Sequence, residues 1–421
     1  MATETTILGA GIIGLSTAYY LARHQPPSTI HLVESCPELF ASASGYAGGF
    51  LARDWFGPGS APLAALSFDE HRRLAKAHNG AARWSYRSST AVSYTPASEG
   101  KARKGPRGED WLRTGASRAD ETQEGGQKKK VQENVVVAPP WLRREEGDEV
   151  NVIGGGANTA QLDPLRLCQF LLDECVRLGV HLHHPARALA VMADMRGELS
   201  AVRIANTTSS SGAESDIPCA RLVIAAGAWS ARVFSDLFPN SVCKLPVSSL
   251  AGHSLVVRSP RWTEEMEASG AGCHAVFTTS RQGYSPEMFS RAGADIWIGG
   301  LNSATTPLPE DPTGSRIEAE AIAQIKKTAA AEEVVIDDLE VVREALCFRP
   351  VTPYGTPIIS RLDDGHLGGG ITTKPDAEGG VFLAAGHGPW GISLSLGTGI
   401  VLAEMAQGRK LSADVSSLLM W

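Results

Sequence analysis

The segment "TTILGAGIIGLSTAYYLARH", residues 5–24, carries the clearest indication of the fold. It opens with a short apolar segment, passes through glycines spaced as GxGxxG, and continues with apolar residues at helical spacing. A second apolar segment, "TIHLVE", follows at residues 29–34. A strand, a glycine turn, a helix and another strand in this order predict a βαβ unit, the opening of a Rossmann-type α/β domain.

The three glycines of this turn have separate tasks in a dinucleotide site. The first permits the tight turn, the second lets the backbone approach a pyrophosphate, and the third allows close helix packing. The helix N-terminus adds backbone N–H groups and a partial positive charge. A glutamate at the end of the second strand is placed for the ribose hydroxyls and disfavours a 2'-phosphate, so NADP is the least expected ligand. The predicted residues are Gly9, Gly11, Ile12, Ile13, Gly14 and Glu34.

FAD and NAD both use this opening, so other glycine-rich segments must separate them. The segment "SASGYAGGF", residues 42–50, has side chains small enough for backbone to pass close to a flat ring, although a flexible loop has the same composition. "LVIAAGAWSARV" (222–233) and "GHGPWGISLSLGTG" (386–399) each predict a glycine turn that begins a helix. At the second of these, the helix N-terminus would stabilise the negative charge of a reduced flavin.

These segments supply the remaining candidates for cofactor contact. They are Ser42, Ser44, Gly45, Gly48, Gly49, Ala226, Gly227, Trp229, Gly386, His387, Gly388, Trp390, Gly391 and Ile392. Two of them have an alternative interpretation, because His387 also suits a simple turn and Trp390 can cover the substrate or pack in the core.

Composition excludes several classes of protein. The 421 residues are 43% hydrophobic, enough for two domains or one large domain with insertions. The formal charge of -7 gives no electrostatic reason to expect a nucleic-acid or membrane partner. Seven cysteines without a CxxC pair favour a reducing compartment and argue against a disulfide framework or a metal site. No apolar run reaches membrane-spanning length, and no signal peptide is evident before Gly9. We therefore expect an intracellular, cytoplasmic protein without membrane insertion.

The middle of the chain changes character twice. Residues 98–134 hold nine Lys/Arg, seven Asp/Glu and few apolar residues, which predicts a disordered insertion. From 240 to 345, alternating segments such as "HSLVVRS" and "DIWIGG" predict an antiparallel sheet. Beyond it, "REALCFRPVTPYGTPIIS" (343–360) places Cys347 two positions before Arg349, so on a strand both side chains leave the same face.

The motifs together resemble the D-amino-acid-oxidase-like family of FAD-dependent oxidoreductases. The matching segments, in family order, are "ILGAGIIGLSTAYYLA", "SASGYAGGF", "LDPLRLCQFLLDECVRLGV", "LVIAAGAWSARV", "LCFRPVTPYGTPIIS" and "FLAAGHGPWGISLSLGTGIVLAE". The likeness is strongest to fungal members of unassigned activity, with features of glycine oxidase and of the sarcosine and fructosyl-amine oxidases.

The resemblance implies a mixed α/β fold with an FAD-binding domain over 1–90, 150–235 and 340–421. A substrate domain would span 236–339 with part of 84–150. It also implies oxidation of the C–N bond of an amine or amino acid to an imine, by hydride transfer to flavin N5, with dioxygen as the acceptor. Two alternatives stay open: a dehydrogenase that uses a quinone or protein acceptor, and a flavin-fold protein with a trafficking or scaffolding role.

The resemblance also suggests roles for single residues. Arg349 matches the arginine that binds the substrate carboxylate in the glycine-oxidase branch, although a structural, salt-bridged arginine is the alternative. Cys347 falls where sarcosine oxidases carry a cysteine linked covalently to the flavin. This chain departs from that branch, with Ser393 in place of a lysine, and buried cysteines are commonly inert. The candidates to cover the substrate are Tyr354, Tyr284 and His253.

Overall fold

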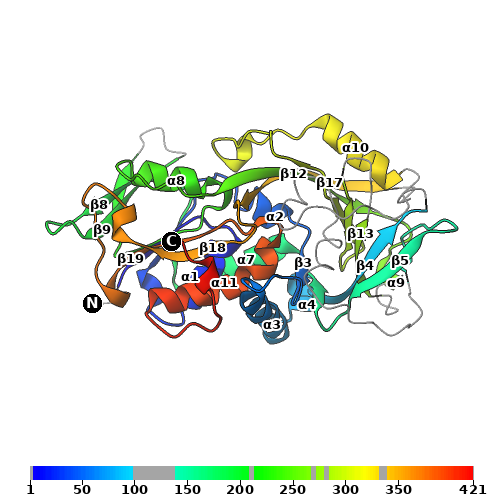
Figure 1. Ribbon diagram of the computed structural model, residues 1–421, viewed down its shortest axis with the longest axis horizontal. Helices are drawn as coiled ribbons and strands as arrows, with labels where there is room; N and C mark the ends of the chain where they lie inside the picture. Colours follow the sequence, from blue (N-terminus) through cyan, green and yellow to red (C-terminus); the bar gives the residue numbers. More distant parts are fainter. Residues whose placement is uncertain are drawn as a thin grey trace.

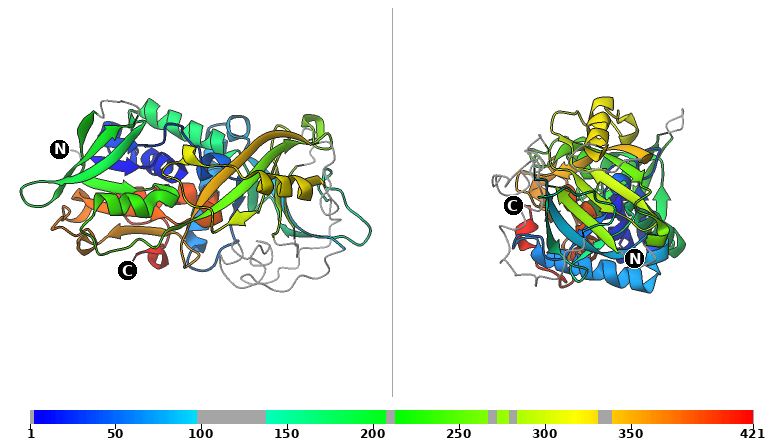
Figure 2. Two further views of the ribbon diagram at one scale, coloured as in Figure 1. Left: turned by 90° about the horizontal axis from the view of Figure 1, so that it is seen from above. Right: turned by 90° about the vertical axis from the view of Figure 1, so that its right-hand side faces the viewer.

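The computed structural model describes residues 3–97, 138–207, 213–266, 272–278, 284–330 and 339–420. The predicted insertion, 98–134, lies outside the described residues. Two sheet-based halves lie side by side along the long axis (Figure 1), and the view from above shows the same division (Figure 2). No helix in the described part of the chain is both long and apolar enough to cross a membrane.

The first half is built on a six-stranded sheet in the order β18-β19-β11-β1-β2-β7. Its strands are β1 (Thr5–Leu8), β2 (Ile30–Val33), β7 (His181–His183), β11 (Arg221–Ile224), β18 (Ile358–Leu362) and β19 (Gly380–Ala385). All neighbours pair in parallel except β18, which runs antiparallel to β19. Segments from the start, middle and end of the chain therefore build one sheet, which confirms the Rossmann-type fold.

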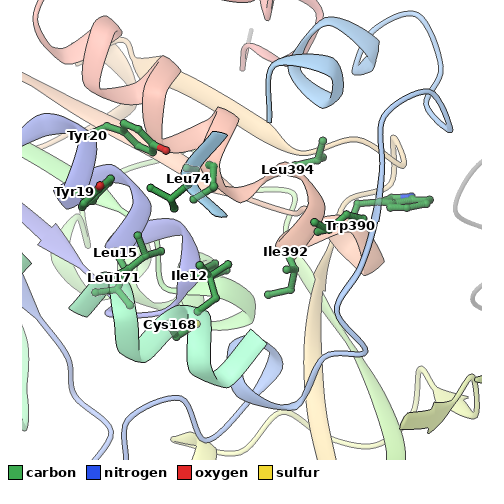
Figure 3. Close-up of a cluster of buried hydrophobic side chains, with 14 of the residues drawn as sticks. Ile12, Leu15, Tyr19, Tyr20, Leu74, Cys168, Leu171, Trp390, Ile392 and Leu394 are labelled. Carbon is green, nitrogen blue, oxygen red and sulfur yellow. The ribbon is translucent and has the colours of Figure 1, made fainter. Parts of the chain in front are cut away.

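Four long helices pack on this half: α1 (Ile12–Leu21), α3 (Ala61–Ala77), α7 (Pro164–Leu178) and α11 (Gly391–Ala406). Their apolar side chains form the cluster drawn in Figure 3. At the α1–α11 contact, a Cβ added to Gly399 would lie 2.5 Å from the carbonyl carbon of Ser16, so only glycine allows this approach. Helix α7 begins where the Asp163 side chain accepts a hydrogen bond from the Arg166 N–H, and ends at Gly179 with φ of +102°.

The second half is a ten-stranded sheet in the order β16-β12-β15-β14-β13-β4-β6-β3, with β17 paired to β12 and β5 to β4. The strands are β3 (Phe50–Ala52), β4 (Arg87–Thr95), β5 (Glu149–Gly154), β6 (Thr159–Gln161), β12 (Ser248–Arg258), β13 (Cys273–Thr278), β14 (Glu287–Ser290), β15 (Asp295–Gly299), β16 (Asn302–Ser303) and β17 (Glu340–Val351). Pairing is antiparallel except between β13 and β4, which run parallel.

The two faces of this sheet follow the alternation of its strands. Leu255 and Ile298 belong to a core cluster that includes Ile325 of α10 (Ala319–Ala330). The neighbouring positions, Val256 and Trp297, belong instead to the core shared with the first half. The large sheet thus turns one face to a helix and the other to the nucleotide-binding half.

Smaller elements complete the structure. A three-stranded antiparallel sheet has the strands β8 (Ala186–Ala193), β9 (Leu199–Asn206) and β10 (Glu214–Pro218). The remaining helices are α2 (Ala43–Tyr46), α4 (Gly80–Arg83), α8 (Ser230–Leu237) and α9 (Glu264–Met266). The segment 42–50 is therefore not a simple loop, because it holds the single turn α2 and starts β3.

The structure adds one detail to the domain boundaries predicted from the sequence. It assigns residues 340–421 to FAD binding, yet β17 pairs with β12 of the large sheet from Glu340 to Val351. β17 also contacts α2 and the turn before α11, which belong to the nucleotide-binding half.

Candidate cofactor-binding and active site

A cavity of about 450 Å³ lies between the two halves. One end of the cavity is lined by Leu8 and Val33, the last residues of β1 and β2. The other end is lined by Phe289 and Trp297 of the large sheet. The carboxyl end of a parallel sheet is where α/β folds bind nucleotides. The cavity therefore joins a nucleotide-binding edge to the face of a second sheet.

The β1–α1 turn is shaped as the glycine pattern predicts. Gly9 has φ of +103°, and a Cβ added to Gly14 would lie 1.9 Å from the Gly9 carbonyl oxygen. The Ile12 N–H donates to Ser44 Oγ at 3.0 Å. A Cβ added to Gly11 would lie 2.9 Å from the same hydroxyl, so a larger residue would fill the space beside this turn.

Glu34 is held in place by backbone groups. Its Oε2 accepts a hydrogen bond from the Ala10 N–H at 2.9 Å, and its Oε1 accepts one from the Cys36 N–H at 2.8 Å. The carboxylate lines the cavity at the end of β2. This position fits the ribose-binding role expected from the sequence.

Side chains of the large sheet hold residues 46–48, at the end of α2 and just after it. Trp297 Nε1 donates to the Tyr46 carbonyl oxygen at 3.0 Å. Arg291 Nη2 donates to the carbonyl oxygens of Ala47 and Gly48, at 2.6 and 2.9 Å. A Cβ added to Gly48 would lie 2.5 Å from the Phe289 ring, so the backbone passes directly over this ring.

The helix N-terminus at α11 forms another wall. His387, Gly388 and Ile392 line the cavity. Burial lowers the pKa of His387 to about 3, so its imidazole is neutral at pH 7; its Nε2 lies 3.2 Å from Thr398 Oγ1. Ser393 connects α11 to β3, because its hydroxyl oxygen accepts a hydrogen bond from the Ala52 N–H at 3.1 Å.

Cys347 and Arg349 of β17 both line the cavity. Arg349 Nη1 donates to Asn302 Oδ1 at 2.5 Å. The guanidinium reaches Asn302 by crossing Gly252, where an added Cβ would lie 1.9 Å from Nη1. Burial raises the pKa of the Cys347 thiol, while the charges of Arg349 and Arg343 oppose this rise.

Most of the cofactor candidates named from the sequence meet at this cavity. Those that line it are Gly9, Gly11, Ile12, Ile13, Glu34, Ser42, Ser44, Gly48, Gly49, Ala226, Gly227, Trp229, Cys347, His387, Gly388, Gly391 and Ile392. Those outside its lining are Gly14, Gly45, Gly386 and Trp390. The Trp390 ring packs against Phe56 with 4.6 Å between ring centroids.

The other candidates for substrate contact lie elsewhere. His253 accepts a hydrogen bond from the Glu318 N–H at its Nε2, 3.1 Å away, and does not line the cavity. Tyr354, 51% exposed, sits in the turn after β17. The buried Tyr284 donates its hydroxyl hydrogen to Thr328 Oγ1 at 2.8 Å.

The structure adds residues that the sequence reasoning missed. Glu287, Phe289 and Trp297 line the cavity from the large sheet, and the rings of Phe289 and Trp297 stack with 5.2 Å between centroids. The alternating side chains of "DIWIGG" predict a strand with two different faces. Only the strand pairing shows which of these faces lies against the nucleotide-binding half.

A second segment that was not predicted from the sequence lines the cavity at its nucleotide-binding end. Glu310 and Asp311 line the cavity there. Trp229 Nε1 donates to the Pro309 carbonyl oxygen at 2.9 Å, and Arg187 pairs with Glu310 at the same distance.

The cavity fits an FAD. The glycines of the β1–α1 turn leave room that any Cβ would fill, Glu34 lines the cavity at the end of β2, and the space continues past the α11 N-terminus to the aromatic face.

Known proteins are similar to this chain in sequence or in fold. The protein of Schizosaccharomyces pombe named as an oxidoreductase is 27% identical over 436 residues, covering 98% of this chain and 96% of the relative. The D-amino acid dehydrogenase of Bradyrhizobium diazoefficiens is 25% identical over 463 residues, covering 99% and 97%. The crystal structure of glycine oxidase from Geobacillus kaustophilus superposes with a TM-score of 0.71 at 20% identity, covering 100% of this chain and 98% of that one, and shares the fold.

The family model described as FAD dependent oxidoreductase matches residues 4–405, nearly the whole chain. It confirms the family predicted from the glycine motifs, and with it FAD as the cofactor. The chain belongs to the D-amino-acid-oxidase-like (DAO) family of FAD-dependent oxidoreductases.

Proposed function

We propose that this protein oxidises the C–N bond of an amino acid, or of another amine that carries a carboxylate. The observation that carries the proposal is the position of Arg349, whose guanidinium enters the cavity wall and is held by Asn302. A planar guanidinium binds a carboxylate through two parallel hydrogen bonds. Two relatives, a D-amino acid dehydrogenase and a glycine oxidase by name, support an amino-acid substrate.

The FAD, when bound, supplies the two-electron oxidant for this reaction. The protein's own residues bind and orient. Arg349 fixes the carboxylate, Asn302 fixes the guanidinium, and the rings of Phe289 and Trp297 exclude water from the cavity. The His387 imidazole stays neutral at pH 7. The partial positive charge at this wall of the cavity therefore comes from the N-terminus of α11.

We further propose that the FAD is held noncovalently. Cys347 lines the cavity, but burial raises the pKa of its thiol. Because the thiolate is the nucleophilic form, a raised pKa works against a thioether to the flavin. The contacts that retain the cofactor are then those of the β1–α1 turn, Glu34 and the segment after α2.

Dioxygen is the proposed acceptor, and a quinone or protein acceptor is the second candidate because a D-amino acid dehydrogenase matches along the whole chain. Peroxide production during turnover in air separates the two. An oxidase forms peroxide in proportion to substrate consumed, whereas a dehydrogenase turns over only when an artificial acceptor is added.

The main test is anaerobic bleaching of the flavin colour by D- and L-amino acids, N-methyl amino acids and cyclic imino acids, with carboxylate-free amines of matching size for comparison. We expect only carboxylate-bearing substrates to bleach efficiently. Replacing Arg349→Met should raise the half-saturating concentration by about 30-fold or more, because a charge-assisted contact is lost. Bleaching by carboxylate-free amines alone would show that Arg349 has another role.

Arg258→Met is the matched control. Arg258 lies on β12, its side chain is half exposed, and its Nε donates to Asp295 Oδ1 at 3.1 Å. It is absent from the cavity lining, so its removal should leave bleaching unchanged. Equal losses in both variants would indicate a general effect on stability.

A further inference from the structure

A segment of the large-sheet half reaches the nucleotide-binding end of the cavity. Residues 308–313, which we call the strap, lie between β16 and α10 in the chain. Three of them, Glu310, Asp311 and Pro312, line the same cavity as Glu34 of the nucleotide-binding half. Both halves therefore border the end of the cavity at which Glu34 is expected to bind the ribose.

Two side chains of the nucleotide-binding half donate hydrogen bonds to the backbone of the strap. Trp229 Nε1 donates to the Pro309 carbonyl oxygen at 2.9 Å. Arg232 donates to the same oxygen through Nη2 at 3.2 Å, and to the Glu310 carbonyl oxygen through Nη1 at 3.0 Å. A charged donor makes the stronger kind of hydrogen bond. Because the acceptors are main-chain atoms, these bonds fix the path of the strap itself.

An apolar contact and an ion pair add to this attachment. Leu308 and Trp229 pack against a buried cluster that includes Phe348. The ion pair between Arg187 and Glu310 is exposed on both sides, so its contribution is small. Leu308 lies outside the cavity lining, so its side chain anchors the strap without meeting a ligand.

A buried cysteine lies beside the strap. Cys36, two positions after Glu34, is 2% exposed and lines the cavity. Burial raises the pKa of the Cys36 thiol to about 11, and the Asp311 carboxylate adds to the rise. A hydrogen bond from the Thr313 backbone acts in the opposite direction. Two residues of the strap thus lie against this thiol, which should become accessible when the strap moves away.

We infer that the strap closes over the adenosine moiety of the bound FAD and slows the release of the cofactor. An adenosine held at Glu34 lies at the end of the cavity that the strap borders, so the strap must move before this moiety can leave there. The nucleotide-binding half then recognises the ribose, and the large-sheet half retains it. The inference concerns the cofactor alone and does not depend on the proposed substrate or acceptor.

The rate at which FAD leaves the loaded protein provides the first test. Release after dilution is followed by the rise in flavin fluorescence. Leu308→Ala should speed release about fivefold, because the strap loses its apolar anchor. Arg232→Met should speed it about tenfold, because two charge-assisted hydrogen bonds are lost. The controls are Ile317→Ala, an exposed residue that follows the strap, and Arg177→Met, an exposed ion-paired residue of α7; both should release FAD at the natural rate.

Labelling of Cys36 tests whether the strap itself has moved. The protein is treated with a maleimide in excess FAD, so that the site stays filled, and labelled cysteines are identified by mass spectrometry. Leu308→Ala and Arg232→Met should speed the labelling of Cys36 by a factor similar to that for FAD release. Cys175 is the internal reference, because it is buried, lies outside the cavity lining and donates from α7 to the Leu15 carbonyl oxygen of α1. Its labelling should be equally slow in every protein.

Two results would overturn the inference. Natural rates of FAD release in Leu308→Ala and Arg232→Met would mean that the strap does not retain the cofactor. Faster release with unchanged labelling of Cys36 would mean that these residues act on FAD without any movement of the strap. Arg232 is exposed, so its variant keeps the test decisive even if Leu308→Ala folds poorly. The same variants are also made with Cys347→Ala, so that a thioether cannot hide release, and neither measurement needs substrate turnover.

Discussion

Arg291 Nη2 donates a hydrogen bond to the Gly48 carbonyl oxygen at 2.9 Å. Arg291 follows β14 of the large sheet, whereas Gly48 belongs to the segment that lines the cofactor cavity between α2 and β3. The arginine is buried, and burial lowers its pKa to about 10, so it remains protonated at pH 7. One buried cation thus joins the two halves at the cavity.

The substitution Arg291→Met should weaken the contact between the two halves of the protein. The carbonyl oxygens of Ala47 and Gly48 would lose their charged donor inside the protein, which we expect to lower the free energy of unfolding by about 3 kcal/mol. The affinity for FAD should fall with it, because the cavity-lining segment is no longer held. Denaturant unfolding and FAD titration measure the two effects. Arg203→Met, which removes an exposed ion pair with Asp216, is the control and should leave the stability nearly unchanged. An Arg291→Met protein with unchanged FAD affinity would contradict this assignment.

Gly14→Ala should be poorly tolerated. The added methyl group would lie 1.9 Å from the Gly9 carbonyl oxygen, and backbone must move to admit it. We expect a loss of about 1–3 kcal/mol in stability and a clear fall in bound FAD, since the same turn faces the nucleotide. The ratio of flavin to protein absorbance and the melting temperature report both. At Gly57 an added Cβ meets no atom within 4 Å, so Gly57→Ala is the control. Normal FAD content in Gly14→Ala would mean that the turn adapts.

Acid precipitation tests how the cofactor is attached. Because burial raises the pKa of Cys347, we expect the yellow colour to stay in the supernatant when the protein is precipitated with acid. Cys347→Ala should accordingly bind FAD as the natural chain does. Colour that remains in the pellet of the natural protein, and moves to the supernatant in Cys347→Ala, would establish a thioether instead.

Stability should fall between pH 7 and pH 5, in part through His71. Its Nε2 lies 2.9 Å from the Ile392 carbonyl oxygen, and burial lowers its pKa to about 4. The unfolded chain, with a histidine pKa near 6.5, binds the proton first as the pH falls. Proton binding then favours unfolding, by about 2 kcal/mol at pH 5 relative to pH 7.

The variant His71→Gln isolates this contribution. A glutamine amide can donate to the same carbonyl but does not titrate, so urea unfolding at the two pH values should show a smaller loss than in the natural chain. His78→Gln, at the end of α3, serves as the matched control, because His78 makes no hydrogen bond to α11 in the described part of the chain. An equal loss in all three proteins would assign the pH dependence to other groups.

The nucleotide end of the cavity was predictable from local sequence patterns. The spacing of Gly9, Gly11 and Gly14, with Glu34 at the end of the next strand, encodes a turn within one βαβ unit. Such a unit is local: each residue's task depends on neighbours a few positions away and on the period of the helix or strand. The motif order was likewise enough to name the family that the chain's full-length match confirms.

The tertiary structure alone decided which residues meet at the other end. Arg349 reaches Asn302 because β17 and β16 pair on opposite sides of β12. Phe289 and Trp297 line the cavity through the pairing of β14 with β15. Trp390 packs into the core and Tyr354 lies outside the cavity. Strand register depends on contacts between segments far apart in the chain, which alternation within a single strand does not encode. The face that each strand turns to the cavity was therefore fixed by sheet pairing.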